Sequence, residues 1–139
     1  MKATLQFDPI HGFTGTSESG KKAFFDTLID SDGSNTGANP VETVLMAAAA
    51  CSAMDVVPIL QKRKKSVTSL TIELTATRAE THPKVFTHIE MDFHLVSPNA
   101  TVEELSHAIE LSHSKYCSVS IMLMRSGCEV TWKASVATS

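Results

Sequence analysis

The 139-residue sequence carries little excess of either charge: 15 acidic side chains against 12 basic ones leave a net charge of −3. Such a balance gives no indication of a nucleic-acid or acidic-membrane partner. The chain also lacks an apolar segment at its start, because residues 2–7 alternate between polar and apolar types. We therefore expect no secretory signal. No internal repeat, low-complexity segment or domain linker is visible, and the length predicts a single domain over residues 1–139.

Cysteine is scarce as well, with three widely spaced residues, Cys51, Cys117 and Cys128. An odd and scattered set does not make the disulfide framework of a small secreted domain. A cytoplasmic protein is the simplest interpretation, and in that compartment a disulfide is more often transient and chemical than structural. The histidines are scattered and share no metal-ligand spacing, so we expect no metal site.

The longest apolar stretch, residues 44–60, contains only two polar residues, Ser52 and Asp55. A helix that is apolar on every side is a buried helix. The stretch is shorter than the roughly 20 residues that a membrane span needs, and Asp55 interrupts it. Asn39 suits the N-cap of this helix and Pro40 its first position. We therefore expect the central helix of a globular core and no membrane partner.

Short segments of alternating polarity precede and follow this helix, and they predict half-buried strands. A capping box, Thr101 to Glu104, predicts a further helix, another helix is expected over 117–125, and Gly127 is suited to end it. The resulting order predicts an α+β layer arrangement. The first three strands are too short to bury an apolar face alone, which pairing with a second subunit would solve. The expected strands cover residues 2–7, 13–17, 22–29, 69–80, 85–96 and 128–136.

Two of the three cysteines are in positions that suit a reactive thiol. Cys51 lies near the middle of the expected central helix. Cys117 comes where a helix begins, and there unpaired amides and the helix dipole favour a thiolate. Each is also consistent with a small hydrophobic residue in a core. For Cys128, which continues the alternation of a strand, that second interpretation is the stronger one.

The segments that contain these two cysteines resemble the OsmC/Ohr family. The first is residues 39–57, which includes Cys51-Ser52-Ala53-Met54-Asp55, and the second is residues 111–119, which ends in Tyr-Cys-Ser-Val. The strand segment 78–89 is similar too. The resemblance covers most of the chain from Asn39 onward, and within the family it is to the short, YhfA-like branch.

This resemblance implies an OsmC-like α+β fold, in which antiparallel β-sheets wrap around a long central helix carrying Cys51, in an intertwined homodimer. It also implies a thiol-dependent peroxidase. Cys51 would be oxidised by an organic or hydrogen peroxide to a sulfenic acid, Cys117 would resolve it as a disulfide, and a dithiol reductant would restore both thiols. No metal or organic cofactor is needed for this chemistry.

The resemblance is incomplete in the groups that activate the thiol. Peroxidases of the family also use an Arg from the N-terminal region and a Glu near the start of the helix. This chain has no Arg before Arg63, and Lys21 or Lys22 does not replace a planar guanidinium. Val41 stands where the Glu would fall, and Glu42 follows about 100° further round a regular helix. Glu42 is therefore a third candidate, which either faces the site or only stabilises the first turn.

These departures leave other hypotheses open. The chain could be a non-catalytic OsmC-like binding or redox-sensing module with an apolar pocket at the dimer interface. Its methionines would make such a pocket adaptable. A purely structural dimer with inert thiols is the third hypothesis. Asp55 lies one turn after Cys51 and either orients a neighbour or pairs with Arg78 of the facing sheet, and we expect the pairing. The methionines in question are Met46, Met54, Met122 and Met124.

Overall fold

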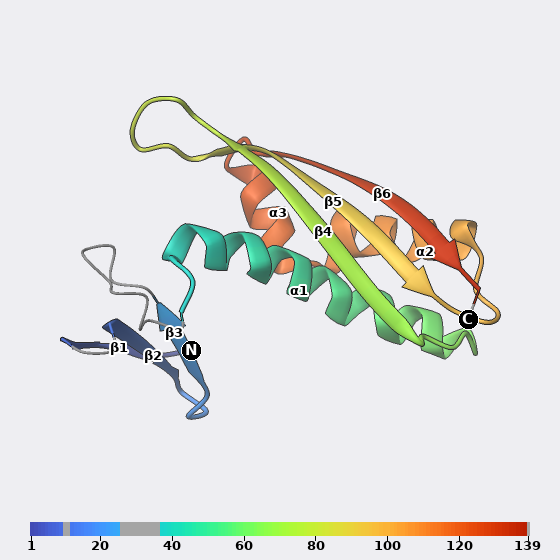
Figure 1. The fold of residues 1–139 in the computed structure, drawn as a ribbon, viewed down its shortest axis with the longest axis horizontal. Coiled ribbons are helices and arrows are strands. Elements are labelled where there is room, and N and C mark those ends of the chain that lie inside the picture. The colour runs from blue at the N-terminus through green and yellow to red at the C-terminus, as the bar shows by residue number, and fades with distance from the viewer. Residues whose placement is uncertain (10–11, 26–36, 139) are drawn as a thin grey trace. The chain divides into compact units, whose positions relative to one another are not determined.

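A computed structural model describes residues 1–9, 12–25 and 37–138 of the chain. These residues form two compact units, Met1–Val44 and Leu45–Ser139. The long helix α1, Pro40–Lys62, begins in the first unit and continues through the second. Figure 1 shows the elements of both units in chain order.

The first unit contains a three-stranded antiparallel sheet in the order β1-β2-β3. Its strands are β1, Ala3–Asp8, β2, Gly12–Ser17, and β3, Lys22–Phe25. The predicted strands agree with these bounds within one residue, except that residues 26–29 and most of the expected loop lie outside the described residues. Leu5 and Phe7 are 61% and 65% exposed, which agrees with the expectation that so small a sheet cannot bury an apolar face by itself.

Helix α1 begins as the sequence predicts. Asn39 is the N-cap, because its Oδ1 accepts a hydrogen bond from the Glu42 amide at 2.8 Å. The Glu42 carboxylate in turn accepts from the Asn39 amide at 3.2 Å. These reciprocal bonds form a capping box and satisfy two backbone amides that the first turn leaves free.

The second unit is built on a mixed sheet of three strands in the order β4-β5-β6. Strands β4, Ser69–Arg78, and β5, Phe86–Val96, pair antiparallel, as the alternating segments predict. Strand β6, Glu129–Ala137, pairs with β5 in parallel, so the expected antiparallel arrangement does not extend to it. The reason is the connection: the chain passes through two helices between β5 and β6, and such a crossover brings the next strand in with the same direction.

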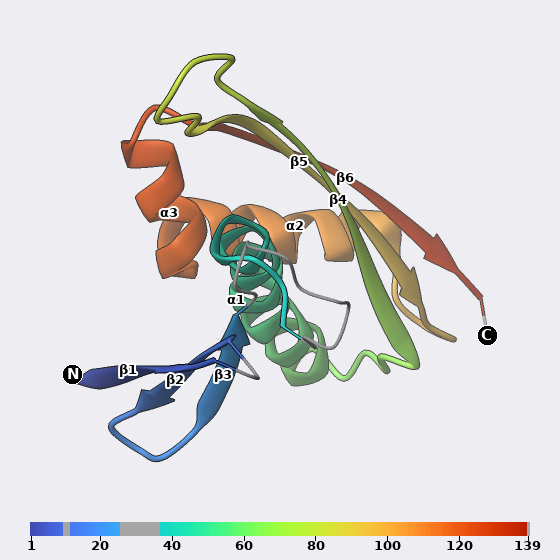
Figure 2. The ribbon, with the colours of Figure 1, turned by 60° about the vertical axis from the view of Figure 1, so that its left-hand side comes forward.

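Helices α2, Val102–Leu111, and α3, Ser118–Arg125, belong to this crossover. The predicted capping box opens α2, since Thr101 and Glu104 exchange hydrogen bonds of 2.9 and 3.2 Å. Gly127 follows α3 with φ of +98°, the left-handed conformation that ends a helix at little cost for glycine. Figure 2 shows α2, α3 and the part of α1 in the second unit on one face of the β4-β5-β6 sheet.

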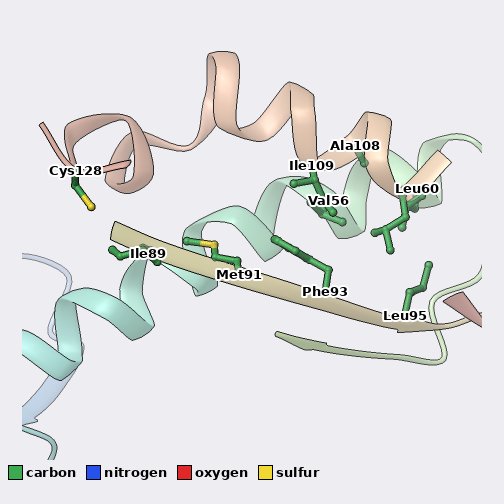
Figure 3. Packing of buried hydrophobic residues seen from close by; sticks show 11 residues of the cluster. Val56, Leu60, Ile89, Met91, Phe93, Leu95, Ala108, Ile109 and Cys128 are labelled. Carbon is green, nitrogen blue, oxygen red and sulfur yellow. The ribbon is translucent and has the colours of Figure 1, made fainter. Parts of the chain in front are cut away.

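The core lies between that sheet face and the helices. Alternate residues of β5 point into it, from Ile89 through Met91 and Phe93 to Leu95, and each is at most 1% exposed. Figure 3 shows these side chains against residues of α1 and α2. The helices contribute Ala48, Val56 and Leu60 from α1 and Leu105, Ala108 and Ile109 from α2, all of them fully buried.

Helix α1 buries one stripe and not its whole circumference, which corrects the expectation of an evenly buried helix. Ala48, Ser52, Val56 and Leu60 follow one another every four residues and are fully buried, as one face of an α-helix requires. On other faces Met54 is 76% exposed. Among the described residues, α1 is long and apolar enough to cross a membrane by length and composition, a property it shares with core helices of soluble proteins.

Candidate functional site

A single turn of π-helix, Ser112–Tyr116, joins α2 to Cys117. The sequence predicts a break at this point, whereas the structure has a wider helical turn. The Cys117 amide donates to the Ser112 carbonyl at 2.7 Å, the bond to the fifth preceding residue that defines a π-turn. Cys117 then serves as the N-cap residue of α3. Such turns occur often at functional sites.

Cys117 is fully buried, and its thiol has three neighbours. Its Sγ donates to Ser120 Oγ at 3.1 Å and lies 3.8 Å from the Ala48 carbonyl oxygen. The third neighbour is the Cys51 side chain, which is close enough to affect the pKa of the Cys117 thiol. Burial raises the pKa of the Cys117 thiol, hydrogen bonds from Ser120 act in the opposite direction, and Cys51 raises it further. The start of α3 therefore does not produce the thiolate expected from the sequence, because desolvation outweighs it.

Cys51 lies in α1 and is partly exposed, and it brings the second sulfur to this point. The two predicted site cysteines are thus neighbours in space although 66 positions separate them, from 51 to 117. Neither is in a disulfide. Residue Cys51 is partly exposed, whereas Cys117 is fully buried.

A group of polar side chains, three of them buried and one partly exposed, comes from the two segments that carry the cysteines. We call it the serine–histidine cluster and define it as Ser52, Asp55, Ser112 and His113. Ser112 Oγ lies 2.8 Å from the Asp55 carboxylate and 3.2 Å from Ser52 Oγ. Ser52 Oγ in turn lies 3.1 Å from His113 Nε2. Ser52 and Ser112 are completely buried and His113 is 8% exposed, so this is an interior hydrogen-bond network.

His113 keeps one ring nitrogen without a hydrogen bond. Its Nδ1 is buried and has no partner among the described residues. The imidazole ring meets Phe93 edge-on, with centroids 6.3 Å apart. Burial lowers the pKa of His113, and the Asp55 carboxylate opposes part of that shift. The imidazole is therefore held neutral at pH values where an exposed histidine would take up a proton.

Asp55 has a different partner from the one expected, whereas the contacts of Glu42 agree with one of its two expected roles. Asp55 bonds to Ser112 and does not pair with Arg78, whose Nε donates to the Lys84 carbonyl at 2.8 Å. Glu42 is engaged in the capping box of α1. The sequence indicated the cluster only through Ser52 and Asp55, the two polar residues of an otherwise apolar helix. Its other half, Ser112 and His113, was not singled out as functional.

Cys128 is a core residue, as its place in the strand pattern predicts. It is 3% exposed and belongs to the hydrophobic cluster (Figure 3). Burial raises the pKa of its thiol, and the nearby Glu129 adds to the effect. Its environment is therefore that of an inert thiol.

One group of possible metal ligands lies on the polar face of the β4-β5-β6 sheet. Glu73, Asp92 and His94 bring ligand atoms within 4.8 Å of one another. The sequence spacing does not reveal this group, because its members come from two different strands. His94 Nε2 lies 3.5 Å from Asp92 and 3.6 Å from Glu73, and Nδ1 lies 2.8 Å from Ser135 Oγ. With a protonated His94 these contacts are surface ion pairs.

A groove of about 350 Å³ in the second unit is lined by α1 and the π-helical turn. Its walls are mostly apolar and include Met54, Pro58 and Tyr116, while Asp55 of the serine–histidine cluster and Lys62 provide charge. The groove could hold a small apolar molecule or side chain.

The fold and the paired sulfurs define the class of protein, an α+β protein whose long helix and following helical turn bring two cysteines together. More particularly, the chain belongs to the OsmC-like family, whose model matches residues 32–133. The YhfA protein of Escherichia coli K12 is 40% identical over 123 residues, which cover 88% of this chain and 89% of the relative. The resemblance seen in the sequence is thereby confirmed.

Solved structures share the fold. A hypothetical protein from Aquifex aeolicus VF5 is 28% identical with a TM-score of 0.82, and the match covers 99% of this chain and 96% of the other. The organic hydroperoxide resistance protein OhrB of Bacillus subtilis is 15% identical with a TM-score of 0.61, and 96% of each chain is covered. These neighbours share the fold in which α1 contributes Ala48, Val56 and Leu60 to the core.

Proposed function

We propose that this chain is a thiol-dependent, peroxidase-like redox protein that reduces organic or hydrogen peroxides through Cys51 and Cys117. In the first step the Cys51 thiolate attacks the peroxide oxygen, the O–O bond breaks, and the departing alkoxide or hydroxide takes up a proton. The products are a Cys51 sulfenic acid and an alcohol or water. In the second step the Cys117 sulfur displaces the sulfenic oxygen, which leaves as water with the Cys117 proton, and a disulfide forms. A dithiol reductant then returns both thiols by exchange.

The observation that supports this proposal is the pairing of a partly exposed Cys51 with a buried Cys117. Peroxide must reach the attacking sulfur, and Cys51 is the accessible one of the two. Cys117 has a raised pKa because it is buried, so little of it is present as the reactive thiolate. This division of labour agrees with Cys51 as the attacking thiol and Cys117 as the resolving one.

The proposal also covers the oligomeric state and the cellular compartment. We propose one functional domain over residues 1–139 that acts as a homodimer in the cytoplasm. The exposed apolar side chains of α1, Val44, Met46 and Met54, are 40%, 49% and 76% exposed in a single chain, and a second copy would cover them. Three free thiols suit a reducing compartment.

Glu42 remains a proposed third site residue, although its carboxylate already accepts a hydrogen bond from Asn39. The variant Glu42→Gln keeps an acceptor for that bond and removes the charge. We expect a loss of peroxide turnover with little change in the melting temperature. Unchanged turnover would leave Glu42 as a helix cap alone.

The test of the main proposal is steady-state reduction of cumene hydroperoxide and hydrogen peroxide by the purified protein with a dithiol such as dihydrolipoamide. We expect turnover in the parent, none in Cys51→Ser, and a trappable sulfenic acid in Cys117→Ser. Cys128→Ser is the matched control and should keep the parent's rate. Peroxide consumption by Cys51→Ser at the parent's rate would refute the proposal.

The second candidate is a non-catalytic binding or redox-sensing module. The absence of Arg from the first 62 residues and the apolar groove beside α1 favour it. Tight binding of an apolar fluorophore that survives replacement of both Cys51 and Cys117 by Ser, without peroxide turnover in the parent, would identify this function instead.

A further inference from the structure

The serine–histidine cluster connects the two cysteine-bearing segments. Ser52 directly follows Cys51 in α1, and Asp55 lies one turn further along. Ser112 and His113 open the π-helical turn that ends at Cys117. Three side-chain contacts between 2.8 and 3.2 Å link these four residues across 57 to 61 positions of sequence.

We propose that this cluster positions the π-helical turn against α1 so that the Cys117 sulfur can close on Cys51, and that Ser52, Ser112 and His113 are positioning residues of the thiol pair. The proposal rests on the thiol chemistry proposed above and assigns residues that sustain it. It concerns the approach of the two sulfurs and is independent of which oxidant is used.

Ser112 connects the π-helical turn to α1 through two hydrogen bonds. Its carbonyl oxygen accepts the Cys117 amide at 2.7 Å, while its hydroxyl bonds to Asp55 of α1 at 2.8 Å. One residue therefore ties the backbone of Cys117 to the helix that carries Cys51. A disulfide requires Cα atoms less than about 7 Å apart in a narrow range of orientations, so a loose π-turn would close the pair less often.

His113 completes the cluster as a neutral group. Ser52 provides its hydrogen bond at Nε2, and Nδ1 has no acceptor nearby among the described residues. A second ring proton would therefore sit in the interior without a partner, which costs free energy. Asp55 from α1 is the charged group that acts on the imidazole, and β5 presents the uncharged Phe93 to it. Protonation of His113 should thus loosen the cluster.

The reaction that reports on this positioning is exchange with glutathione. Two Cys thiols and one oxidised glutathione give the Cys51–Cys117 disulfide and two molecules of glutathione, so two electrons pass from the protein to the glutathione disulfide. The equilibrium constant of this exchange is an effective concentration of one thiol at the other. No peroxide takes part, so the measurement is separate from the peroxidase assay.

The experiment measures this effective concentration and the melting temperature of the full chain in Cys128→Ser, which leaves only the pair. Into this background Ser52→Ala and His113→Phe are introduced, together with His113→Gln, which keeps a polar atom near the position of Nε2. We expect Ser52→Ala and His113→Phe to lower the effective concentration about tenfold, as the loss of a buried hydrogen-bond partner suggests. His113→Gln should stay within about threefold of the parent on the same reasoning.

Ser97→Ala is the matched control. Ser97 is 2% exposed, and its Oγ accepts hydrogen bonds from the amides of Ala100 and Asn99 at 3.0 and 3.3 Å, outside the cluster. It should lower the melting temperature and leave the effective concentration unchanged. If Ser52→Ala behaves like this control, the cluster is merely structural and the proposal is wrong.

Two further outcomes are decisive. In the parent we expect the effective concentration to fall only at pH values lower than the ordinary histidine pKa of about 6.5, because burial lowers the pKa of His113 in the folded chain, and we expect the fall to vanish in His113→Gln. An equally steep fall in that variant would contradict the proposal. If Ser52→Ala does not fold, Asp55→Asn, at the rim of the groove, replaces it. This variant should also lower the effective concentration. A parent chain that forms its disulfide but consumes no peroxide would refute the proposed function and leave this inference intact.

Discussion

Ser120→Ala is the substitution that probes the state of the resolving thiol most simply. Ser120 is fully buried, and its hydroxyl is 3.1 Å from the Cys117 sulfur. When Cys117 is ionised, Ser120 donates to the thiolate instead, and this lowers the pKa of Cys117 against the larger effect of burial. Removing the hydroxyl should therefore raise that pKa.

The size of the change follows from ordinary hydrogen-bond energies. A net contribution of about 0.5–1.5 kcal/mol, at about 1.36 kcal/mol per pKa unit, predicts an increase of roughly 0.4–1.1 units. At neutral pH the thiolate fraction would fall by a factor of roughly 2.5 to 13. Exchange reactions in which Cys117 is the attacking thiolate should slow by a smaller factor, because a thiolate of higher pKa is the stronger nucleophile.

The assay is a pH titration of the cysteine Cβ resonances by NMR, which resolves Cys117 from the other two thiols. The glutathione-driven closure rate of the disulfide is measured beside it. Ser118→Ala, on the exposed neighbouring position, is the control and should leave both quantities unchanged. A midpoint for Cys117 that stays constant or moves down in Ser120→Ala would refute this reading of the site.

Further predictions concern stability and assembly. The lowered pKa of His113 means that the unfolded chain binds a proton more readily than the folded one, so the melting temperature should decrease as pH falls below about 6.5; His113→Gln should flatten this slope. The raised pKa values of Cys117 and Cys128 stabilise the fold below about pH 9, and the stability they contribute should be lost at higher pH, with a shallower loss in Cys128→Ser. Leu60→Ala, at a fully buried position, should lower the free energy of unfolding by about 2–5 kcal/mol, as urea titration would show. Met54→Lys, at a side chain 76% exposed in one chain, should shift the mass measured by light scattering toward the monomer, whereas Thr75→Lys on the polar sheet face should not.

Much of the fold could be predicted because the signals are local. The N-cap at Asn39 and the capping box at Thr101 depend on residues three positions apart, and both are present as predicted. The alternation in β4 and β5 reports which face is buried, and it also holds. The parallel pairing of β6 could not be read in this way, because it depends on the path of the crossover through α2 and α3.

The sequence also could not predict how much of the circumference of α1 is buried in a single chain. An apolar helix indicates that its faces are to be covered but not by which chain, and a single chain covers only the stripe containing Ala48, Val56 and Leu60. Met54, on another face of α1, is 76% exposed.

The sequence predicted the two cysteines of the site but not the residues that surround them. Cys51 and Cys117 were found through the resemblance of their sequence contexts to a family, and they are neighbours in the structure. The raised pKa of Cys117 is a consequence of its depth, which the position at a helix start does not reveal. The partners of Asp55 and His113 come from segments 57 to 61 residues away, so only the fold brings them together.

The most direct measurement is the identity of the disulfide formed when the reduced protein is treated with one equivalent of cumene hydroperoxide. Peptide mass spectrometry after blocking free thiols should show an intramolecular Cys51–Cys117 bond. Cys128 should carry the blocking reagent, which shows that its thiol was not in a disulfide. Retention of all three thiols, or a disulfide that includes Cys128, would contradict the proposal that the two neighbouring sulfurs are the reactive pair.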